Sequence, residues 1–353
     1  MTAEARLTID LDALAANYAT LRDAAAGAEV AGVIKADGYG LGAGQVGRRL
    51  CAEGARTLFV ARLSEAEALR AALGDTPAHI MVLDGVAPGE HARFAASRLT
   101  PVLNTPGQLA YWRGLDRAPL SIHVDTGMNR LGLSADEAKA LAAAGAEVAL
   151  VMSHLGSAAE PDNPRNAAQL ARFQAARSLF PAARASLAAS AGTYLSADYR
   201  FDMVRPGISL FGGGPREVPD PRFKAVATLD APILQVRDLA AGDRVGYGAM
   251  FTAPRAMRAA VVGSGYADGV LRTSHAAGAG WLNGVRVPFL VVTMDMIVVD
   301  IGECPDARPG DRVELLGPHA QLDDLAVAAG SVAHEILVNI SARATRTYIG
   351  EAA

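Results

Sequence analysis

The sequence contains 353 residues, of which 51% are hydrophobic, and its 33 basic and 37 acidic residues give a net charge of −4. This length suits two domains with large cores, and the balanced charge, without a basic tail, argues against nucleic acid or a membrane surface as a partner. The two cysteines form no metal or redox motif, no run approaches the roughly 20 apolar residues of a membrane span, and the N-terminus lacks the apolar segment of a signal peptide. We therefore expect a cytoplasmic protein with no metal site.

Short apolar runs alternate with helical patterns through roughly the first 220 residues. A helix is expected over residues 10–26. Eight strands are expected at 30–34, 57–60, 79–83, 101–103, 120–124, 148–152, 185–188 and 202–204. Ser64 with Glu67 has the spacing of a capping box, and Thr105 before Pro106 that of an N-cap. Eight strand–helix units predict a TIM (β/α)8 barrel. A doubly wound open sheet has the same local pattern, but it normally needs fewer units, and no G-x-G-x-x-G turn follows the first strand.

The pattern changes after Pro215. Strands are expected at 226–236, 259–262, 285–299, 311–316 and 336–340, joined by Gly, Asp and Pro turns and interrupted by one helix at 322–329. This is a mainly β domain. We assign residues 1–222 to the barrel and 223–353 to the β domain, with roughly the first eight residues pairing with the β domain.

The first predicted strand ends on Lys35 and continues into a glycine-rich turn. A lysine at the end of an apolar strand must be paired, exposed or used chemically, and a side chain that snorkels at the rim of a sheet is the plain explanation. Other polar residues also follow predicted strands: Tyr39, Asp125, Asn129, Arg130, Ser153, His154, Ser190 and Arg205. Because reactive residues of TIM barrels lie at the C-terminal ends of the strands, we expect these side chains to gather at the barrel mouth.

The loops after the seventh and eighth predicted strands read Ala-Ser-Ala-Gly from residue 189 and Arg-Pro-Gly-Ile from residue 205. Barrel phosphate sites are commonly built from these two loops, and a hydroxyl with glycine-exposed N–H groups suits a dianionic phosphate. Turn glycines and a helix cap explain each loop singly but not their joint placement. A phosphate site that faces a lysine is the arrangement that a pyridoxal phosphate enzyme requires.

Taken in order, several segments closely resemble the motifs of alanine racemases, which are fold-type III pyridoxal phosphate enzymes. They are VIKADGYGLG, VDTGMNRLG, SHLGSA, SAG, MVRPGISLFG, VGYGAMF, GYADG, TMDM and HEI, and they span about residues 7–348. The resemblance implies pyridoxal 5′-phosphate as cofactor, L- and D-alanine as substrates, and a homodimer with shared active sites. It also implies that the D-alanine is supplied for peptidoglycan.

The resemblance further implies roles for individual residues. Racemisation removes a proton from one face of the substrate and returns one to the other, so two groups are needed. Lys35, which would bind the cofactor covalently, is implied as one base and Tyr266 of the second subunit as the other. A phenol is a poor base unless a cation or hydrogen bond stabilises its anion, and His154 and Arg205 are candidates for that network. The other implied residues are Tyr39, Ser190, Gly207, Ile208 and His334 at the phosphate, His154 against the ring, Arg205 at the ring nitrogen, Arg130 and Met294 at the substrate, and Asp295 and His123 in support.

Several positions depart from the common family pattern. His123 stands where many members have a lysine, often carbamylated, that positions the following arginine. Ala189 replaces an asparagine, His334 a phosphate-binding tyrosine, and Val291 and Val292 stand in place of a Gly-Arg pair.

The main alternative is therefore a broad-specificity amino acid racemase. A decarboxylase of the same fold type would lack the tyrosine of GYADG, and a non-catalytic pyridoxal phosphate carrier would lack the β domain. A sugar-phosphate enzyme without the cofactor would have no use for an arginine at a ring nitrogen.

Overall fold

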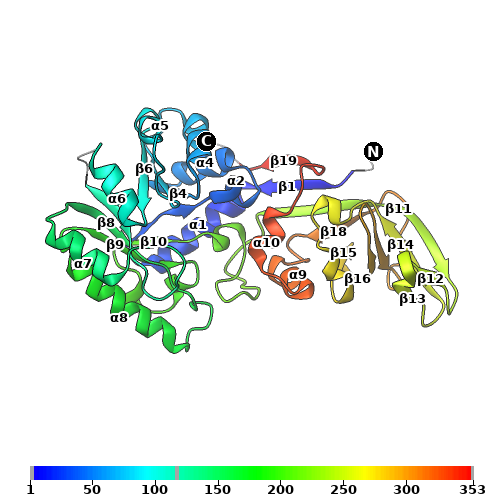
Figure 1. Ribbon diagram of the computed structural model, residues 1–353. Coiled ribbons are helices and arrows are strands. Elements are labelled where there is room, and N and C mark those ends of the chain that lie inside the picture. Colours follow the sequence, from blue (N-terminus) through cyan, green and yellow to red (C-terminus); the bar gives the residue numbers. More distant parts are fainter. Residues whose placement is uncertain (1–3, 116–118, 351–353) are drawn as a thin grey trace. The chain divides into compact units, whose positions relative to one another are not determined.

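The computed structural model describes residues 4–115 and 119–350 and divides into two compact units. One unit comprises residues 15–210. The other comprises the N-terminal residues up to Leu14 and the chain from Phe211 onward. In Figure 1 the elements of residues 15–210 run from blue to green, and those of the later chain from green to red. Within the described ranges, no helix is long and apolar enough to cross a membrane.

The unit of residues 15–210 is built on parallel strands. They are β2 (Glu29–Val30), β3 (Gly32–Val33), β4 (Thr57–Val60), β5 (His79–Val82), β6 (Leu99–Leu103), β7 (Leu120–His123), β8 (Val148–Met152), β9 (Arg184–Ala189) and β10 (Met203–Arg205). Their order in the sheet is β2-β10-β9-β8-β7-β6-β5-β4-β3. Since β2 and β3 are two pieces of one strand interrupted at Ala31, these nine segments form eight strands, and the sheet closes. The predicted TIM-barrel fold is confirmed, and the open sheet is excluded.

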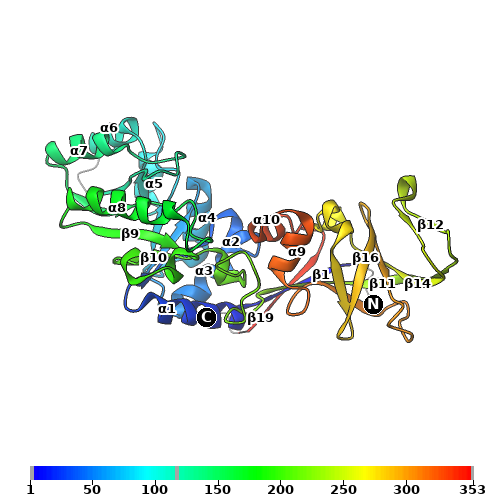
Figure 2. The same ribbon diagram turned by 90° about the horizontal axis from the view of Figure 1, so that it is seen from below.

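Helices surround the outside of these strands, as Figures 1 and 2 show for α4 to α8. The helices are α1 (Leu11–Ala25), α3 (Ala43–Ala52), α4 (Leu63–Leu73), α5 (His91–Ala96), α6 (Pro106–Arg113), α7 (Ala135–Ala143) and α8 (Pro164–Ser178). Inside, the strands contribute a common core of Ala31, Val33, Phe59, Met81, Val102, Leu150, Met152 and Met203. This packed interior holds the strand ends in fixed positions, which is what a site at the barrel mouth requires.

Two predicted helix starts have different outcomes. Thr105 Oγ1 accepts the Gln108 N–H at 3.2 Å, so the predicted N-cap before Pro106 is confirmed. The capping box predicted at Ser64 is wrong, because α4 begins at Leu63. The carboxylate of Glu65 accepts the N–H groups of residues 61 and 62, at 2.8 and 3.2 Å. These bonds cap the start of the helix two residues before the predicted position.

The second unit is mainly β. Its strands are β1 (Arg6–Asp10), β11 (Ala227–Leu239), β12 (Arg244–Val245), β13 (Phe251–Thr252), β14 (Met257–Val262), β15 (Ala279–Leu282), β16 (Val285–Val292), β17 (Ile297–Asp300), β18 (Arg312–Leu316) and β19 (Thr345–Ile349), with helices α9 (Leu322–Ala329) and α10 (Ala333–Val338). The sheet order is β14-β17-β16-β15-β18-β11-β1-β19, and a further pairing of β14 with β11 closes a circuit of six strands. In both views α9 and α10 lie together at one end of this sheet.

Two predictions for this unit are wrong. Residues 285–299 are not one strand but the hairpin β16–β17, whose turn is closed by the Thr293 N–H donating to Met296 O at 2.8 Å. Because apolar residues flank the turn on both sides, the sequence resembles one continuous strand. Residues 336–338 end α10, and residues 339 and 340 follow the helix, so they form no strand. Ile336 and Ile340 are buried while Val338 between them is 44% exposed, which does not fit the alternation of a strand.

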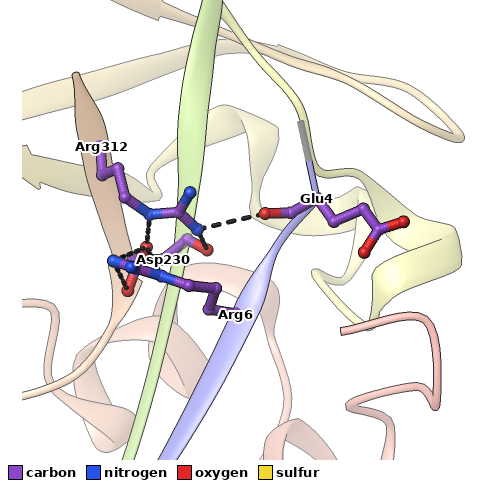
Figure 3. Close-up of polar contacts among 4 residues, drawn as sticks. All are labelled: Glu4, Arg6, Asp230 and Arg312. Atoms are coloured by element: carbon purple, nitrogen blue, oxygen red, sulfur yellow. Dashed lines mark hydrogen bonds and ion pairs between the residues drawn. The ribbon is translucent and has the colours of Figure 1, made fainter. Parts of the chain in front are cut away.

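A charged cluster joins the N-terminal strand to the sheet (Figure 3). Strand β1 pairs antiparallel with β11 and parallel with β19. The carboxylate of Asp230 on β11 contacts Arg312 Nε on β18 and lies 3.1 Å from Arg6 Nη2 on β1. Arg312 also donates to the backbone oxygens of Asp230 at 2.9 Å and of Glu4 at 3.2 Å. The mostly buried Arg312–Asp230 pair therefore locks three strands together.

We expect Asp230→Ala to lower the free energy of unfolding by about 1–3 kcal/mol, because it leaves the mostly buried Arg312 without its carboxylate. Arg6→Ala is the matched control. The Arg6 side chain is 53% exposed, so its loss should cost at most about 1 kcal/mol. Urea unfolding of the full chain measures both changes, and equal costs for the two variants would contradict this assignment.

Candidate active site

Lys35 stands where the first barrel strand ends, and the chain then turns in an uncommon way. The four residues Ala36 to Tyr39 have φ values of 52, 54, 63 and 56°, so they form one left-handed turn within the segment α2 (Lys35–Tyr39). The Gly38 N–H donates to Ile34 O at 2.9 Å, and the Ala36 N–H donates to Glu65 Oε1 at 3.0 Å. These bonds bring the chain back on itself and bury Tyr39 in the barrel unit.

The surroundings of Lys35 stabilise its neutral form relative to that of an exposed lysine. Burial lowers the pKa of Lys35, and the positive charge of Arg130 lowers it further, against smaller opposing effects of Glu65 and Asp84. A lysine with a depressed pKa is a better nucleophile and base near neutral pH than a free amine. The snorkelling explanation accounts for neither the burial nor the neighbouring cation.

The loops after β9 and β10 form a cradle of donors. Ser190 Oγ accepts the N–H groups of Gly207 at 3.0 Å and Ser209 at 3.3 Å. A Cβ atom added to Gly207 would lie 2.2 Å from Tyr39 Oη, so only glycine allows the tyrosine hydroxyl this position. Burial raises the pKa of Tyr39, which keeps the hydroxyl protonated and able to donate. Ile208, which follows the cradle glycine, is buried.

The Ser209 hydroxyl, next to this cradle, indicates what kind of ligand the cradle can bind. It is fully buried, and the described residues provide it with no hydrogen-bond partner. A buried hydroxyl without a partner is costly unless a ligand satisfies it. Together with the Ser190 hydroxyl, whose proton is left to donate once its oxygen accepts the two N–H groups, it fits a ligand rich in acceptors, such as a phosphate.

Arg205 lies at the end of β10 and is 3% exposed. Its guanidinium donates to Ser186 Oγ, to Ser153 O and, at 3.4 Å, to Leu187 O. Burial lowers the pKa of Arg205 to about 9, so the group remains charged at neutral pH. Strands β9 and β10 and the end of β8 therefore fix a positive charge inside the barrel mouth.

Burial and this charge together keep two histidines neutral. Burial, followed by the field of Arg205, lowers the pKa of His154 to about 3 and that of His123 to about 4. Asn104 fixes the tautomer of His123, because its Nδ2 donates to the backbone oxygens of residues 83 and 102 at 2.9 and 2.8 Å. Asn104 Oδ1 must then accept from His123 Nδ1 at 3.0 Å, which leaves His123 Nε2 as an acceptor.

The loop that carries Arg130 is shaped by Asp125. The Asp125 carboxylate accepts the N–H groups of residues 127, 128 and 129. Burial is the largest single influence on the pKa of Asp125 and raises it, but these bonds, with a smaller effect of His123, together outweigh burial and lower the pKa. From α8, the buried Gln169 donates to Thr126 Oγ1 at 3.2 Å and to His154 O at 2.9 Å. Gln169 thus joins the loops after β7 and β8.

Two of these supporting residues were missed by the sequence analysis. Asn104 directly follows a predicted strand and could have been found by the same rule that selected Lys35. Gln169 lies in the middle of a helix, where no sequence signal marks it.

The structure brings together one set of the predicted residues at the barrel mouth: Lys35, Tyr39, His123, Arg130, His154, Ser190, Arg205, Gly207 and Ile208. Tyr266, Met294, Asp295 and His334 lie in the other unit. Tyr266 begins the short turn η5 (Tyr266–Asp268) and is 41% exposed, and Met294, in the β16–β17 turn, is 52% exposed. Among the described residues, no group of three or more His, Cys, Asp or Glu side chains could hold a metal ion.

Comparison with known proteins identifies the family. The family model described as alanine racemase, N-terminal domain, matches residues 9–215, and the model described as alanine racemase, C-terminal domain, matches residues 226–348. The chain belongs to the alanine racemase family. The resemblance that the sequence motifs indicated is therefore confirmed.

Full-length racemases agree with this assignment. An alanine racemase of Methylobacterium sp. (strain 4-46) is 44% identical, with 98% of each chain covered. The catabolic alanine racemase of Agrobacterium fabrum is 43% identical over 98% of this chain and 92% of its own length. The crystal structure of alanine racemase from Bartonella henselae with covalently bound pyridoxal phosphate has a TM-score of 0.92 and 36% identity, covering 99% of this chain and all of that one.

The racemase site should show the influence of Arg130 on Lys35 directly. We expect Arg130→Ala to raise the pKa of Lys35, because it removes the nearby positive charge that favours the neutral amine. Competitive labelling of the cofactor-free protein with an amine reagent, read by mass spectrometry at each pH, should show the Lys35 curve moved to higher pH. Arg113→Ala on the outer helix α6 is the control, and a curve that moves equally in both variants would disprove the effect.

His123 should make stability depend on pH. Its folded pKa of about 4 lies below the ordinary value of 6.5, so between these values the unfolded chain binds the additional proton and stability falls as pH falls. His123→Gln should reduce the slope of unfolding free energy against pH in this window by up to about 1.4 kcal/mol per pH unit. His79→Gln, at the exposed start of β5, is the control. A slope unchanged by His123→Gln would contradict the neutral, buried state.

Proposed function

We propose that the protein is a cytoplasmic, pyridoxal-phosphate-dependent alanine racemase that interconverts L- and D-alanine and supplies D-alanine for peptidoglycan. The observation that carries this proposal is the pairing of Lys35, whose pKa is lowered, with the donor cradle of Ser190, Gly207 and Ser209 at the mouth of the same barrel. Membership of the alanine racemase family supports the choice of reaction and substrate.

The residues present fit the cofactor. Lys35 would hold it covalently, and the cradle with Tyr39 would bind its phosphate. Arg205 would face the ring nitrogen and His154 the ring. We also assign His334 to the phosphate, where an imidazole can donate a hydrogen bond as a tyrosine does. The cofactor bound covalently in the Bartonella henselae relative supports this fit.

When bound, pyridoxal phosphate supplies an electron sink that makes the α-proton of an amino acid acidic. Lys35 Nζ then removes or returns that proton on one face, taking it from D-alanine, since its lowered pKa makes the neutral amine more accessible than in an exposed lysine. Tyr266 Oη does the same on the other face, taking it from L-alanine. Arg130, whose side chain is exposed at the barrel mouth, binds the substrate carboxylate.

Arg205 selects racemisation over transamination. A guanidinium has no acceptor and stays charged at neutral pH, so Arg205 would leave a ring nitrogen facing it without a proton. A ring held in that state would withdraw electrons less strongly, which would disfavour transamination. The bonds to Ser186, Ser153 and Leu187 hold Arg205 in this role.

We further propose a homodimer with shared active sites. Residues 1–222 would form the cofactor-binding barrel, and residues 223–353 would bring Tyr266 and Met294, with Asp295 in support, to the partner's site. The partial exposure of Tyr266 and Met294 within their own unit supports this arrangement, because side chains that complete another subunit's site must be accessible before assembly.

One set of measurements tests the function. The purified protein should be yellow, lose that colour in Lys35→Ala, and form D-alanine from L-alanine in a coupled assay. Tyr266→Phe should keep the colour but lose roughly 10²–10⁴-fold in kcat. A colourless protein would refute the proposal. Carbon dioxide release would indicate a decarboxylase, comparable turnover of lysine or arginine would indicate a broad-specificity racemase, and an active monomer would contradict the shared site.

A further inference from the structure

The turn that carries Tyr266 is fixed to the turn that carries Met294. The Tyr266 N–H donates to Thr293 O at 3.0 Å, and the Ala267 N–H donates to Met294 O at 2.9 Å. A Cβ atom added to Gly265 would lie 2.3 Å from Thr293 O, so glycine is required for this approach. The two turns, residues 264–269 and 293–296, therefore behave as one structural piece, which we term the paired turns.

Asp268 closes the first of the paired turns from inside. It is 5% exposed, and its Oδ2 accepts the Gly265 N–H at 2.8 Å. Its backbone oxygen accepts the Ser341 N–H at 3.1 Å, which ties the turn to the segment after α10. Its second carboxylate oxygen, Oδ1, lies 3.4 Å from Arg343 Nε.

Arg343 reaches both turns with different edges of its guanidinium. While Nε faces Asp268, Nη1 donates to Asp295 Oδ1 at 2.9 Å in the second turn. The two carboxylates raise the pKa of Arg343, chiefly through the bond to Asp295. Because the Nε and Nη1 donors are held at a fixed angle in one plane, a bridge of this kind sets the relative orientation of the two carboxylates; a lysine ammonium has no such fork.

The exposure of this bridge indicates a role other than stability. Arg343 and Asp295 are 51% and 53% exposed, and ion pairs at such positions contribute little to folding. A bridge that adds little stability but joins the turns bearing Tyr266 and Met294 is instead suited to precise placement, and displacements of about 1 Å at a reacting group can cost 10²-fold in rate.

We infer that Arg343 is a positioning residue for the second base: by bridging Asp268 and Asp295 it holds Tyr266 in register with Met294. This inference rests on the proposed function for the roles of Tyr266 and Met294. It assigns Arg343 no contact with substrate or cofactor. No motif of the sequence includes Arg343, which lies far in sequence from both turns.

The first test requires no activity. Amide hydrogen exchange of the full chain, followed by mass spectrometry, should show faster exchange in residues 264–269 and 293–296 of Arg343→Lys. Arg255→Lys is the matched control, because the exposed Arg255 forms another ion pair in the same unit, with the less exposed Asp300 at 3.8 Å, at the opposite end of β17 from the paired turns. Unchanged exchange in Arg343→Lys would overturn the inference whether or not the protein is a racemase.

The second test uses the holoenzyme. Arg343→Lys should retain the yellow cofactor while kcat falls by about 10–100-fold, with KM for alanine changed much less. The α-deuterium isotope effect should increase for L-alanine, whose proton Tyr266 removes, and not for D-alanine. Loss of rate with unchanged isotope effects would show a merely structural residue and overturn the inference. Failure of the proposed function is recognised separately, since the unmodified protein would then be colourless or inactive.

Discussion

The site depends on a positive charge buried at the mouth of the barrel. Arg205 donates to a hydroxyl and two backbone oxygens at the ends of neighbouring strands. These hydrogen bonds offset the free-energy cost of removing the guanidinium from water. Its field, added to burial, keeps His123 and His154 neutral. The His123 imidazole thus serves as an oriented hydrogen-bonding group, and Arg130 adds a second cation beside Lys35. An environment of this sign attracts phosphate and carboxylate groups.

The left-handed turn after Lys35 is the second constraint. A non-glycine residue in this conformation costs roughly 1–2 kcal/mol, and such residues usually occur singly, yet Ala36, Asp37 and Tyr39 are all left-handed here. The turn places Lys35 at the strand end and returns Tyr39 so closely over Gly207 that no side chain fits there. The strained turn therefore places both Lys35 and the Tyr39 hydroxyl at the barrel mouth.

The sequence predicted the barrel well because its strands are short apolar runs separated by helices, and each observed strand overlaps its predicted range. It failed where one pattern supports two structures. The apolar residues flanking Thr293 to Met296 read as one strand although they enclose a turn, and residues 336–340 read as a strand although they lie at the end of a helix. At the site, the rule that polar residues follow strands selected Lys35 and Arg205. It could not find Gln169, whose importance arises only when α8 packs beside two loops.

The two proposed bases are fixed by different means, and this difference bears on how the site is completed. Lys35 is set by burial and by a strained turn inside a closed barrel, so its environment exists within a single unit. Tyr266 stands on a turn whose backbone is bonded to Thr293 and Met294 and to the carboxylate of Asp268, and its side chain is partly exposed. The backbone of Tyr266 is therefore oriented within its own unit, but its side chain is not fully covered there. In the proposed homodimer the partner's barrel would complete these surroundings, whereas the surroundings of Lys35 are set within its own unit.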